Sequence, residues 1–235
     1  MGTFLFALAT LAFAWGFSAD VAAQEGGQPG DPMRIVILVD NSQTSFHALP
    51  AIRRGLQQLV NGLPPNHELM LVTTGGHMSI RVPPTRDYLD IQEAIGEINQ
   101  VPSGGNAMIG SVQEIYERFL RTAERRYPMI VVVSSDAYDT SQRVNDKTAN
   151  ELLAGVRKTG VLVNAILLTS NAPSLIRDLT LEMIKRTGGA YESALTVTAL
   201  PTKMKAMAGH IGQQYKRVSP DRVPKEEFRS SPLPR

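Results

Sequence analysis

The fold is decided by the stretch Arg34–Ser45, which reads RIVILVDNSQTS. Residues 35–39 are continuously apolar and rich in β-branched side chains, which is typical of a central strand buried on both faces. Asp40 ends this run abruptly, and Ser42 and Thr44 follow at spacings of two. Three oxygen donors directly after a buried strand predict a site for a hard cation or a phosphate group.

Outward from this stretch, strand patterns alternate with helix patterns. Alternation of this kind predicts a parallel sheet with right-handed crossovers. The segment 78–82 is expected to be an antiparallel edge strand that Pro83-Pro84 end. We therefore predict an α/β, Rossmann-like three-layer sandwich: a six-stranded, mainly parallel sheet with one antiparallel edge strand and helices on both faces. The expected strands are 35–39, 68–74, 78–82, 129–133, 161–168 and 190–193; helices are expected at 45–61, 150–158, and after Asp87, Asn106, Ser174 and Pro201.

The two ends of the chain differ from the middle in composition. Residues 1–23 combine an apolar run of about 14 residues, short for a membrane span, with small residues before Gln24, which predicts a cleaved signal peptide. Residues 24–33 are a Gly/Pro-rich linker, residues 34–215 the domain, and residues 216–235 a disordered tail. We expect a secreted or periplasmic protein with no stable membrane span after processing. An uncleaved N-terminal anchor is the alternative.

The overall composition excludes several classes of function. The 235 residues carry a formal net charge of only +2, so no clustered basic surface for nucleic acid is expected. The chain contains no cysteine, which excludes disulfides, Cys-ligated zinc and thiol catalysis. No Gly-x-Gly-x-x-Gly sequence follows the first strand, so a dinucleotide site is not expected.

Polar residues at the expected strand ends form one candidate site. Asp40 and Asp136 each end a strand, and strand ends of a parallel sheet meet at one edge. With Ser42, Thr44 and Asn106 of the Gly104-Gly105-Asn106 loop, they offer an oxygen-rich shell. Mg²⁺ and Mn²⁺ prefer such ligands.

These residues and the order of elements resemble the von Willebrand factor type A (VWA) domain over residues 34–215. That family's metal-ion-dependent adhesion site (MIDAS) begins with Asp-x-Ser-x-Ser, and residues 40–44 here read DNSQT. The resemblance implies that Ser42 and Thr44 contact the metal directly and that Asp40 acts through water. It also implies that Asp136 is the family's later aspartate, although Ala137 replaces the usual glycine.

The resemblance further implies a binding module without turnover, in which an acidic side chain of a partner protein completes the metal shell. One position departs from the family pattern, because Asn106 stands where a threonine is usual. Its side-chain oxygen either takes part in metal binding or marks a site that has lost its metal. A metal-free VWA scaffold is therefore the alternative.

The enzyme alternative is a haloacid-dehalogenase-like phosphatase. Asp40 would be the nucleophile, Thr74 the phosphate contact, and Asp136 and Asp139 metal ligands. The second aspartate of that class, the general acid, is Ser42 here, and its loss typically costs a factor of about 10²–10⁴ in rate. Asp139 is more simply interpreted as a loop cap.

Overall fold

The computed structural model describes residues 31–218, apart from residues 124, 137, 142–144 and 171. Its six strands form one sheet in the order β3-β2-β1-β4-β5-β6, with only the β2–β3 pair antiparallel. The predicted fold class is confirmed. The signal peptide, most of the linker and most of the tail lie outside the described residues. The elements are β1 (Met33–Val39), η1 (Gln43–Ala48), α1 (Leu49–Asn61), β2 (Glu68–Thr73), β3 (Ser79–Thr85), α2 (Tyr88–Gly96), α3 (Met108–Ile115), η2 (Tyr116–Leu120), β4 (Tyr127–Ser135), α4 (Asp146–Lys158), β5 (Leu162–Leu168), α5 (Leu175–Thr187), β6 (Tyr191–Ala194), η3 (Val197–Ala199) and α6 (Leu200–Val218).

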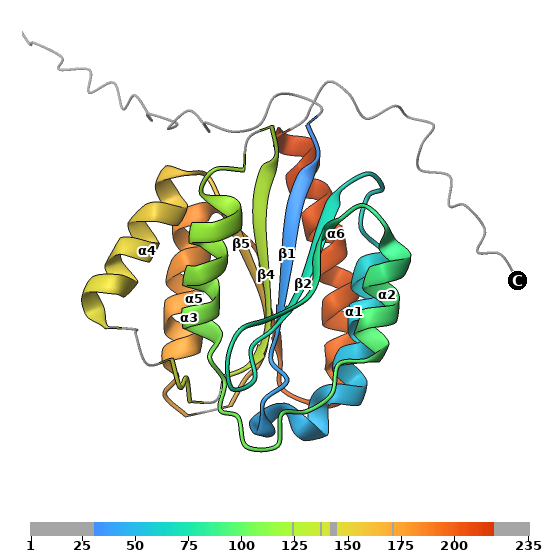
Figure 1. The fold of residues 1–235 in the computed structure, drawn as a ribbon, viewed down its shortest axis with the longest axis vertical. Coiled ribbons are helices and arrows are strands. Elements are labelled where there is room, and N and C mark those ends of the chain that lie inside the picture. The colour runs from blue at the N-terminus through green and yellow to red at the C-terminus, as the bar shows by residue number, and fades with distance from the viewer. Residues whose placement is uncertain (1–30, 124, 137, 142–144, 171, 219–235) are drawn as a thin grey trace, which may run out of the picture.

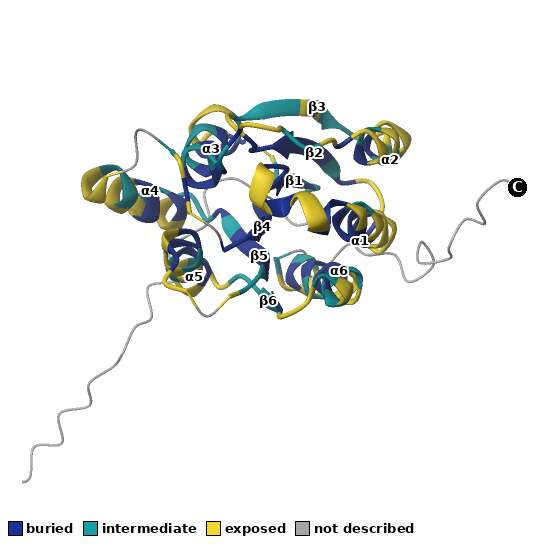
Figure 2. Cartoon of the chain, turned by 90° about the horizontal axis from the view of Figure 1, so that it is seen from below, coloured by how far each residue is buried: buried dark blue, intermediate teal, exposed yellow. Residues whose placement is uncertain are grey.

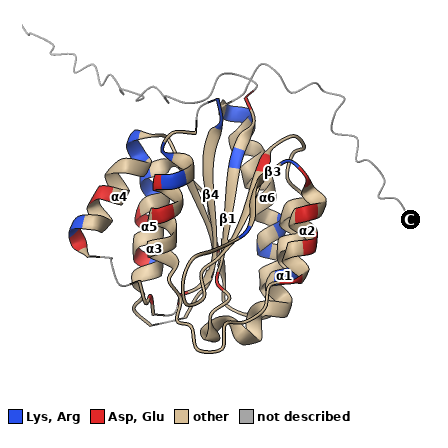
Figure 3. Ribbon diagram, viewed as in Figure 1, with Lys and Arg blue, Asp and Glu red and all other residues tan. Residues whose placement is uncertain are grey.

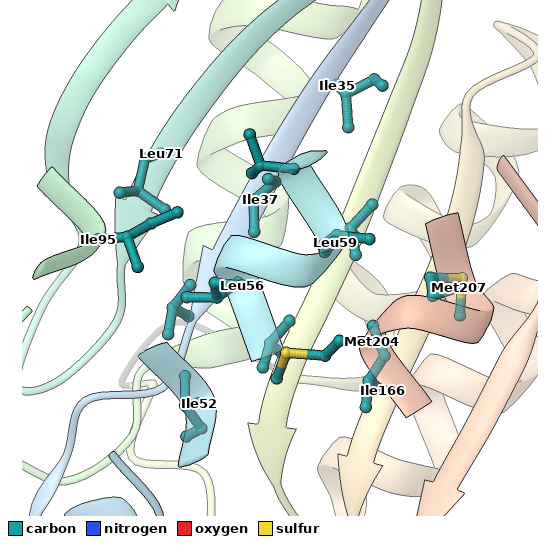
Figure 4. Packing of buried hydrophobic residues seen from close by; sticks show 14 of the residues in the cluster. Ile35, Ile37, Ile52, Leu56, Leu59, Leu71, Ile95, Ile166, Met204 and Met207 are labelled. Atoms are coloured by element: carbon teal, nitrogen blue, oxygen red, sulfur yellow. The ribbon is translucent and has the colours of Figure 1, made fainter. Parts of the chain in front are cut away.

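Helices α1, α2 and α6 cover one face of the sheet, and α3, α4 and α5 cover the other (Figure 1). Alternate residues of β1 point to opposite faces, because the side-chain period of a strand is two. Ile35 and Ile37 pack with α1, α2 and α6, whereas Val36 and Leu38 pack with α3, α4 and α5. Figure 4 shows the first of these two cores, in which Met204 of α6 lies close to α1. The central strand is thus buried on both faces, as its composition predicts.

The first helix begins later than predicted. A 3-10 helix, η1, occupies Gln43–Ala48, and the α-helix starts only at Leu49. Pro50 stands in the first turn of α1, where a missing amide proton costs nothing. The hydroxyl-bearing segment after Asp40 therefore folds as a tight turn at the end of the sheet rather than as a regular helix.

The prediction that Pro83-Pro84 end the edge strand is wrong, since β3 continues to Thr85. Leu71 pairs with Val82 and Leu69 with Thr85, with a register shift between the two pairs. The two prolines fall inside this irregularity at the sheet edge. Their lack of an N–H group therefore removes no hydrogen bond from the sheet.

Two predicted helix caps are confirmed. The Asp87 carboxylate accepts a hydrogen bond from the Leu89 amide, and the Ser174 hydroxyl accepts one from the Arg177 amide. Helix α6 continues through Val218, beyond the expected start of the tail at residue 216. Within the described part of the chain, no helix is both long enough and apolar enough to cross a membrane.

The strand order creates a switch point between β1 and β4. The chain leaves β1 toward α1 on one face and leaves β4 toward α4 on the other (Figure 1). Such divergent connections open a crevice beyond the carboxyl ends of the two strands, where ligands of doubly wound folds bind. Figure 2 looks onto this end of the molecule, with η1 exposed near its centre.

Candidate metal centre

Asp40 directly follows β1 at this end of the sheet and is fully buried. Its backbone amide donates to Val133 of β4, which continues the pairing of the two strands. Its Oδ1 accepts from the Ser42 amide at 2.9 Å, and its Oδ2 accepts from the hydroxyls of Ser45 at 2.5 Å and Ser135 at 2.8 Å. No basic side chain of the described residues forms an ion pair with Asp40. Hydroxyl and amide dipoles alone stabilise this buried carboxylate.

The two predicted hydroxyl ligands lie side by side above Asp40. Ser42 Oγ and Thr44 Oγ1 are 2.8 Å apart. Two ligands at neighbouring corners of an octahedral Mg²⁺ shell, each at about 2.1 Å, are about 3 Å apart. The spacing therefore fits two adjacent metal ligands. Ser42 is buried and Thr44 is exposed, so the outer side of this pair faces solvent.

Asp136 reaches the same crevice from the end of β4. Together with Thr44, Ser135 and Ser170 it lines a pocket of about 450 Å³. Its Oδ2 accepts from the Ser170 amide at 2.7 Å and from the Ser170 hydroxyl at 3.2 Å, and lies 3.5 Å from Arg177 Nη1. Within the described residues, all hydrogen bonds of this carboxylate fall on Oδ2. Oδ1 therefore has no hydrogen bond to the described residues.

Asn106 has a different environment from the other four predicted residues. It is fully buried; its Oδ1 accepts from Thr74 Oγ1 and its Nδ2 donates to Ser134 Oγ, both at 2.8 Å. The amide thus connects the residue that follows β2 with a residue near the end of β4. The structure brings together Asp40, Ser42, Thr44 and Asp136 around one crevice, and it places the Asn106 oxygen in a hydrogen bond beside them.

The glycines before Asn106 allow two loops to pack backbone against backbone. A Cβ atom on Gly104 would lie 2.6 Å from the amide nitrogen of Gly76, which is too close for any side chain. The Gly76 amide donates to Gly105, and the Gln43 amide donates to Gly104. The Gly-Gly loop therefore supports the turn that carries Ser42 and Thr44.

Asp139 acts as the predicted cap. Its Oδ2 accepts from the Ile109 amide in the first turn of α3, and its Oδ1 accepts from the Ser141 amide. Both oxygens are therefore committed to backbone groups. Thr74, the phosphate contact of the phosphatase hypothesis, is fully buried and donates to Asn106. These two residues are not arranged as a phosphatase site would require.

Four residues of the site region were not predicted. Ser135 stands beside Asp136 at the strand end, and Ser45 follows the Asp-x-Ser-x-Thr pattern, so their positions offered a local signal. Ser170 stands beyond the end of β5 and could have been found by applying the same strand-end rule. Arg177 lies inside α5, and no local pattern marks it.

The donors present suit a hard cation bound mainly through hydroxyls. The described residues contain no group of three or more His, Asp or Glu side chains able to hold a metal. Ser42 and Thr44 would fit direct contacts, and Asp40 and Asp136 would act through metal-bound waters. Neutral hydroxyls and waters are ligands that Mg²⁺ and Mn²⁺ accept. The residues therefore fit a divalent cation, with Asn106 as a structural neighbour.

The structure is thus a doubly wound domain with an Asp-x-Ser-x-Thr turn and a second aspartate at its switch point. Residues 35–138 match the sequence profile described as the von Willebrand factor type A domain. The predicted resemblance is confirmed for residues 35–138, whose sequence matches this family's profile. VWA domains are often protein-interaction modules. No curated protein matches the sequence.

Solved structures of low sequence identity share the fold. A von Willebrand factor type A protein from Catenulispora acidiphila has a TM-score of 0.59 and 10% identity, covering 77% of this chain and 43% of that one. An aerotolerance-related membrane protein from Bacteroides fragilis has a TM-score of 0.58 and 18% identity, covering 77% and 99%. Proximal thread matrix protein 1 from the mussel byssus, with a zinc-occupied MIDAS motif, has a TM-score of 0.58 and 15% identity, covering 80% and 46%. This chain therefore spans less than half the length of two of these proteins.

Proposed function

We propose that the protein is an exported binding module that recognises another protein at the crevice between β1 and β4. Ser42 and Thr44 would hold Mg²⁺ or Mn²⁺ directly, and Asp40 and Asp136 would hold it through water. The bound cation would supply an open coordination position for an acidic side chain of the partner. The observation that carries this proposal is the pair of adjacent hydroxyls above a buried carboxylate that has no cationic partner among the described residues.

The surroundings of the crevice favour a protein as the partner. Large apolar side chains are exposed near it: Phe46 of η1 at 51%, Tyr138 after β4 at 85% and Leu195 after β6 at 80%. Leu195 lines the same pocket as Thr44 and Asp136. Aromatic and aliphatic anchors around a polar centre are typical of protein interfaces. We propose binding without turnover, because such anchors suit a surface that docks another protein.

A metal-free scaffold is the second candidate, and the environment of Asn106 favours it. The amide oxygen that stands at the position of a usual ligand accepts a hydrogen bond from Thr74 instead. Fewer oxygen ligands weaken cation affinity. In this alternative the crevice would bind its partner through hydroxyls and apolar contacts alone.

Isothermal titration with Mg²⁺ and with Mn²⁺ distinguishes the cation-dependent binding module from the metal-free scaffold. We expect the wild type to bind at millimolar concentration or below, and Asp40→Ala and Ser42→Ala to bind about 10- to 100-fold more weakly. Asp90→Ala, which removes an exposed carboxylate on α2, is the matched control and should bind as the wild type does. Absence of binding by the wild type would remove the metal from the proposal, and partner binding that survives chelation would favour the scaffold.

A further inference from the structure

Arg177 brings a positive charge to the edge of the candidate metal centre. It lies in the first turn of α5, and its side chain is 25% exposed. Nη1 lies 3.5 Å from Asp136 Oδ2 and 3.3 Å from the Ser170 carbonyl oxygen. Nε lies 3.5 Å from Asp178 on the outer side. The guanidinium group is thus held between the site and solvent.

The surroundings contain few other charges. The stretches 41–52, 98–113, 159–176 and 193–202 include the turns and loops at this end of the sheet, and none contains Lys, Arg, Asp or Glu. Figure 3 shows that the charged residues are concentrated on the outer helices and at the opposite end. Asp139 is compensated by the amides at the start of α3. Among the described residues, Asp40, Asp136 and Arg177 are the charged side chains that reach the site, and their formal charges sum to minus one. Asp178 lies on the outer side of Arg177 and is 68% exposed, so solvent screens its charge.

Arg177 is not needed to hold Asp136 in place. The Ser170 amide at 2.7 Å and the Ser170 hydroxyl at 3.2 Å already fix Oδ2, whereas a nitrogen at 3.5 Å makes only a marginal hydrogen bond. The main effect of Arg177 is consequently its charge. A positive charge close to a divalent cation repels it, and only solvent screening reduces the repulsion.

We propose that Arg177 makes cation binding depend on an anionic partner. With Arg177 present, a divalent cation converts the net charge of the site from one negative to one positive. A carboxylate from the partner restores neutrality, so cation and carboxylate each strengthen the binding of the other. Without Arg177 the cation would leave the site neutral and would bind well alone. This inference rests on the proposed cation site and adds the reason why the site would favour acidic partners.

The test is a titration of the full chain with Mn²⁺, with and without acetate as the carboxylate probe, followed by calorimetry and by the shift in thermal midpoint. Without acetate, we expect Arg177→Gln to bind Mn²⁺ about tenfold more tightly than the wild type does. Acetate should increase the Mn²⁺ affinity of the variant less than it increases that of the wild type. Arg177→Lys keeps the charge and should retain the low affinity, which separates a charge effect from a role of the guanidinium shape. Arg157→Gln, on the exposed side of α4, is the matched control for loss of a surface arginine.

The outcomes separate the two proposals. Equal Mn²⁺ affinity of the wild type and Arg177→Gln, or weaker binding by the variant, would overturn the role of Arg177 and leave the cation site standing. Equal Mn²⁺ affinity of Arg177→Lys and Arg177→Gln would also overturn the role of the Arg177 charge and leave the cation site standing. Absence of Mn²⁺ binding by all of the variants and the wild type, with and without acetate, would overturn both proposals.

Discussion

At the carboxyl end of the sheet Asp40 is buried among hydroxyl groups, whereas at the amino end the partly buried Glu68 lies against two arginines. Glu68 Oε2 lies 2.6 Å from Arg34 Nε and 3.6 Å from Arg126 Nε. Asp40 has only neutral donors in the described structure. The Glu68 charge at the amino end is therefore paired within the chain, whereas the Asp40 charge at the carboxyl end is one that a ligand could neutralise.

His67 adds a third kind of buried polar group at the amino end. Its Nδ1 accepts a hydrogen bond from the Met33 amide, and its ring lies 4.4 Å from that of Tyr215. Burial, with a smaller contribution from the positive charge of Arg86, lowers the pKa of His67 to about 4. The amino end thus uses its polar groups for stability, which gives three ways to test the contrast.

The largest expected effect is the pH dependence that His67 contributes. Between about pH 6.5 and pH 4 the unfolded chain binds a proton that the folded chain does not bind. The free energy of unfolding should therefore fall as the pH falls through this window, by up to about 3 kcal/mol. Urea unfolding of the wild type and His67→Gln at about pH 7 and about pH 4.5 measures the difference. Glutamine keeps an acceptor for the Met33 amide but does not titrate, so an equal pH dependence in both proteins would contradict the assignment.

Glu68→Gln should have the next largest effect, a loss of about 2 kcal/mol in the free energy of unfolding, because two partly buried guanidinium groups would lose their counter-charge. Glu182→Gln is the matched control. Its partner Arg186 lies 2.7 Å away, but both side chains are more than a third exposed on α5. Such a surface pair contributes little to stability, because solvent screens it. Equal losses in the two variants would remove the distinction between paired buried charge and surface charge.

The smallest effect on stability is expected for Asp40→Asn without added cation, a change of less than about 1 kcal/mol. Asparagine keeps an acceptor for the Ser42 amide, and the hydroxyls of Ser45 and Ser135 can rotate to accept from its NH₂ group. The same replacement of carboxylate by amide thus costs more at Glu68 than at Asp40. Thermal unfolding with and without Mn²⁺ should show a stabilising shift in the wild type that the variant lacks. A loss of about 3 kcal/mol in the variant would show that the Asp40 charge itself stabilises the fold.

The sequence alone was enough for the fold class and for most of the site. The apolar run of β1, the alternation of elements and the caps at Asp87 and Ser174 are local signals, since each depends on residues close together in the chain. The strand-end rule brought Asp40, Ser42, Thr44 and Asp136 to one edge without any knowledge of the packing. These predictions succeed because the register of a parallel sheet places successive strand ends side by side.

Only the tertiary structure decided which oxygens are free and which charges are close. The side chain of Asn106 could ligate or bridge, and its burial between Thr74 and Ser134 selects the bridge. Pro83 and Pro84 predict the end of a strand. The irregular pairing at the sheet edge nevertheless allows β3 to continue through both residues. Arg177 is far from Asp136 in sequence and reaches it only because α5 begins beside the end of β4. Each of these outcomes depends on contacts between distant segments, and neither composition nor periodicity specifies such contacts.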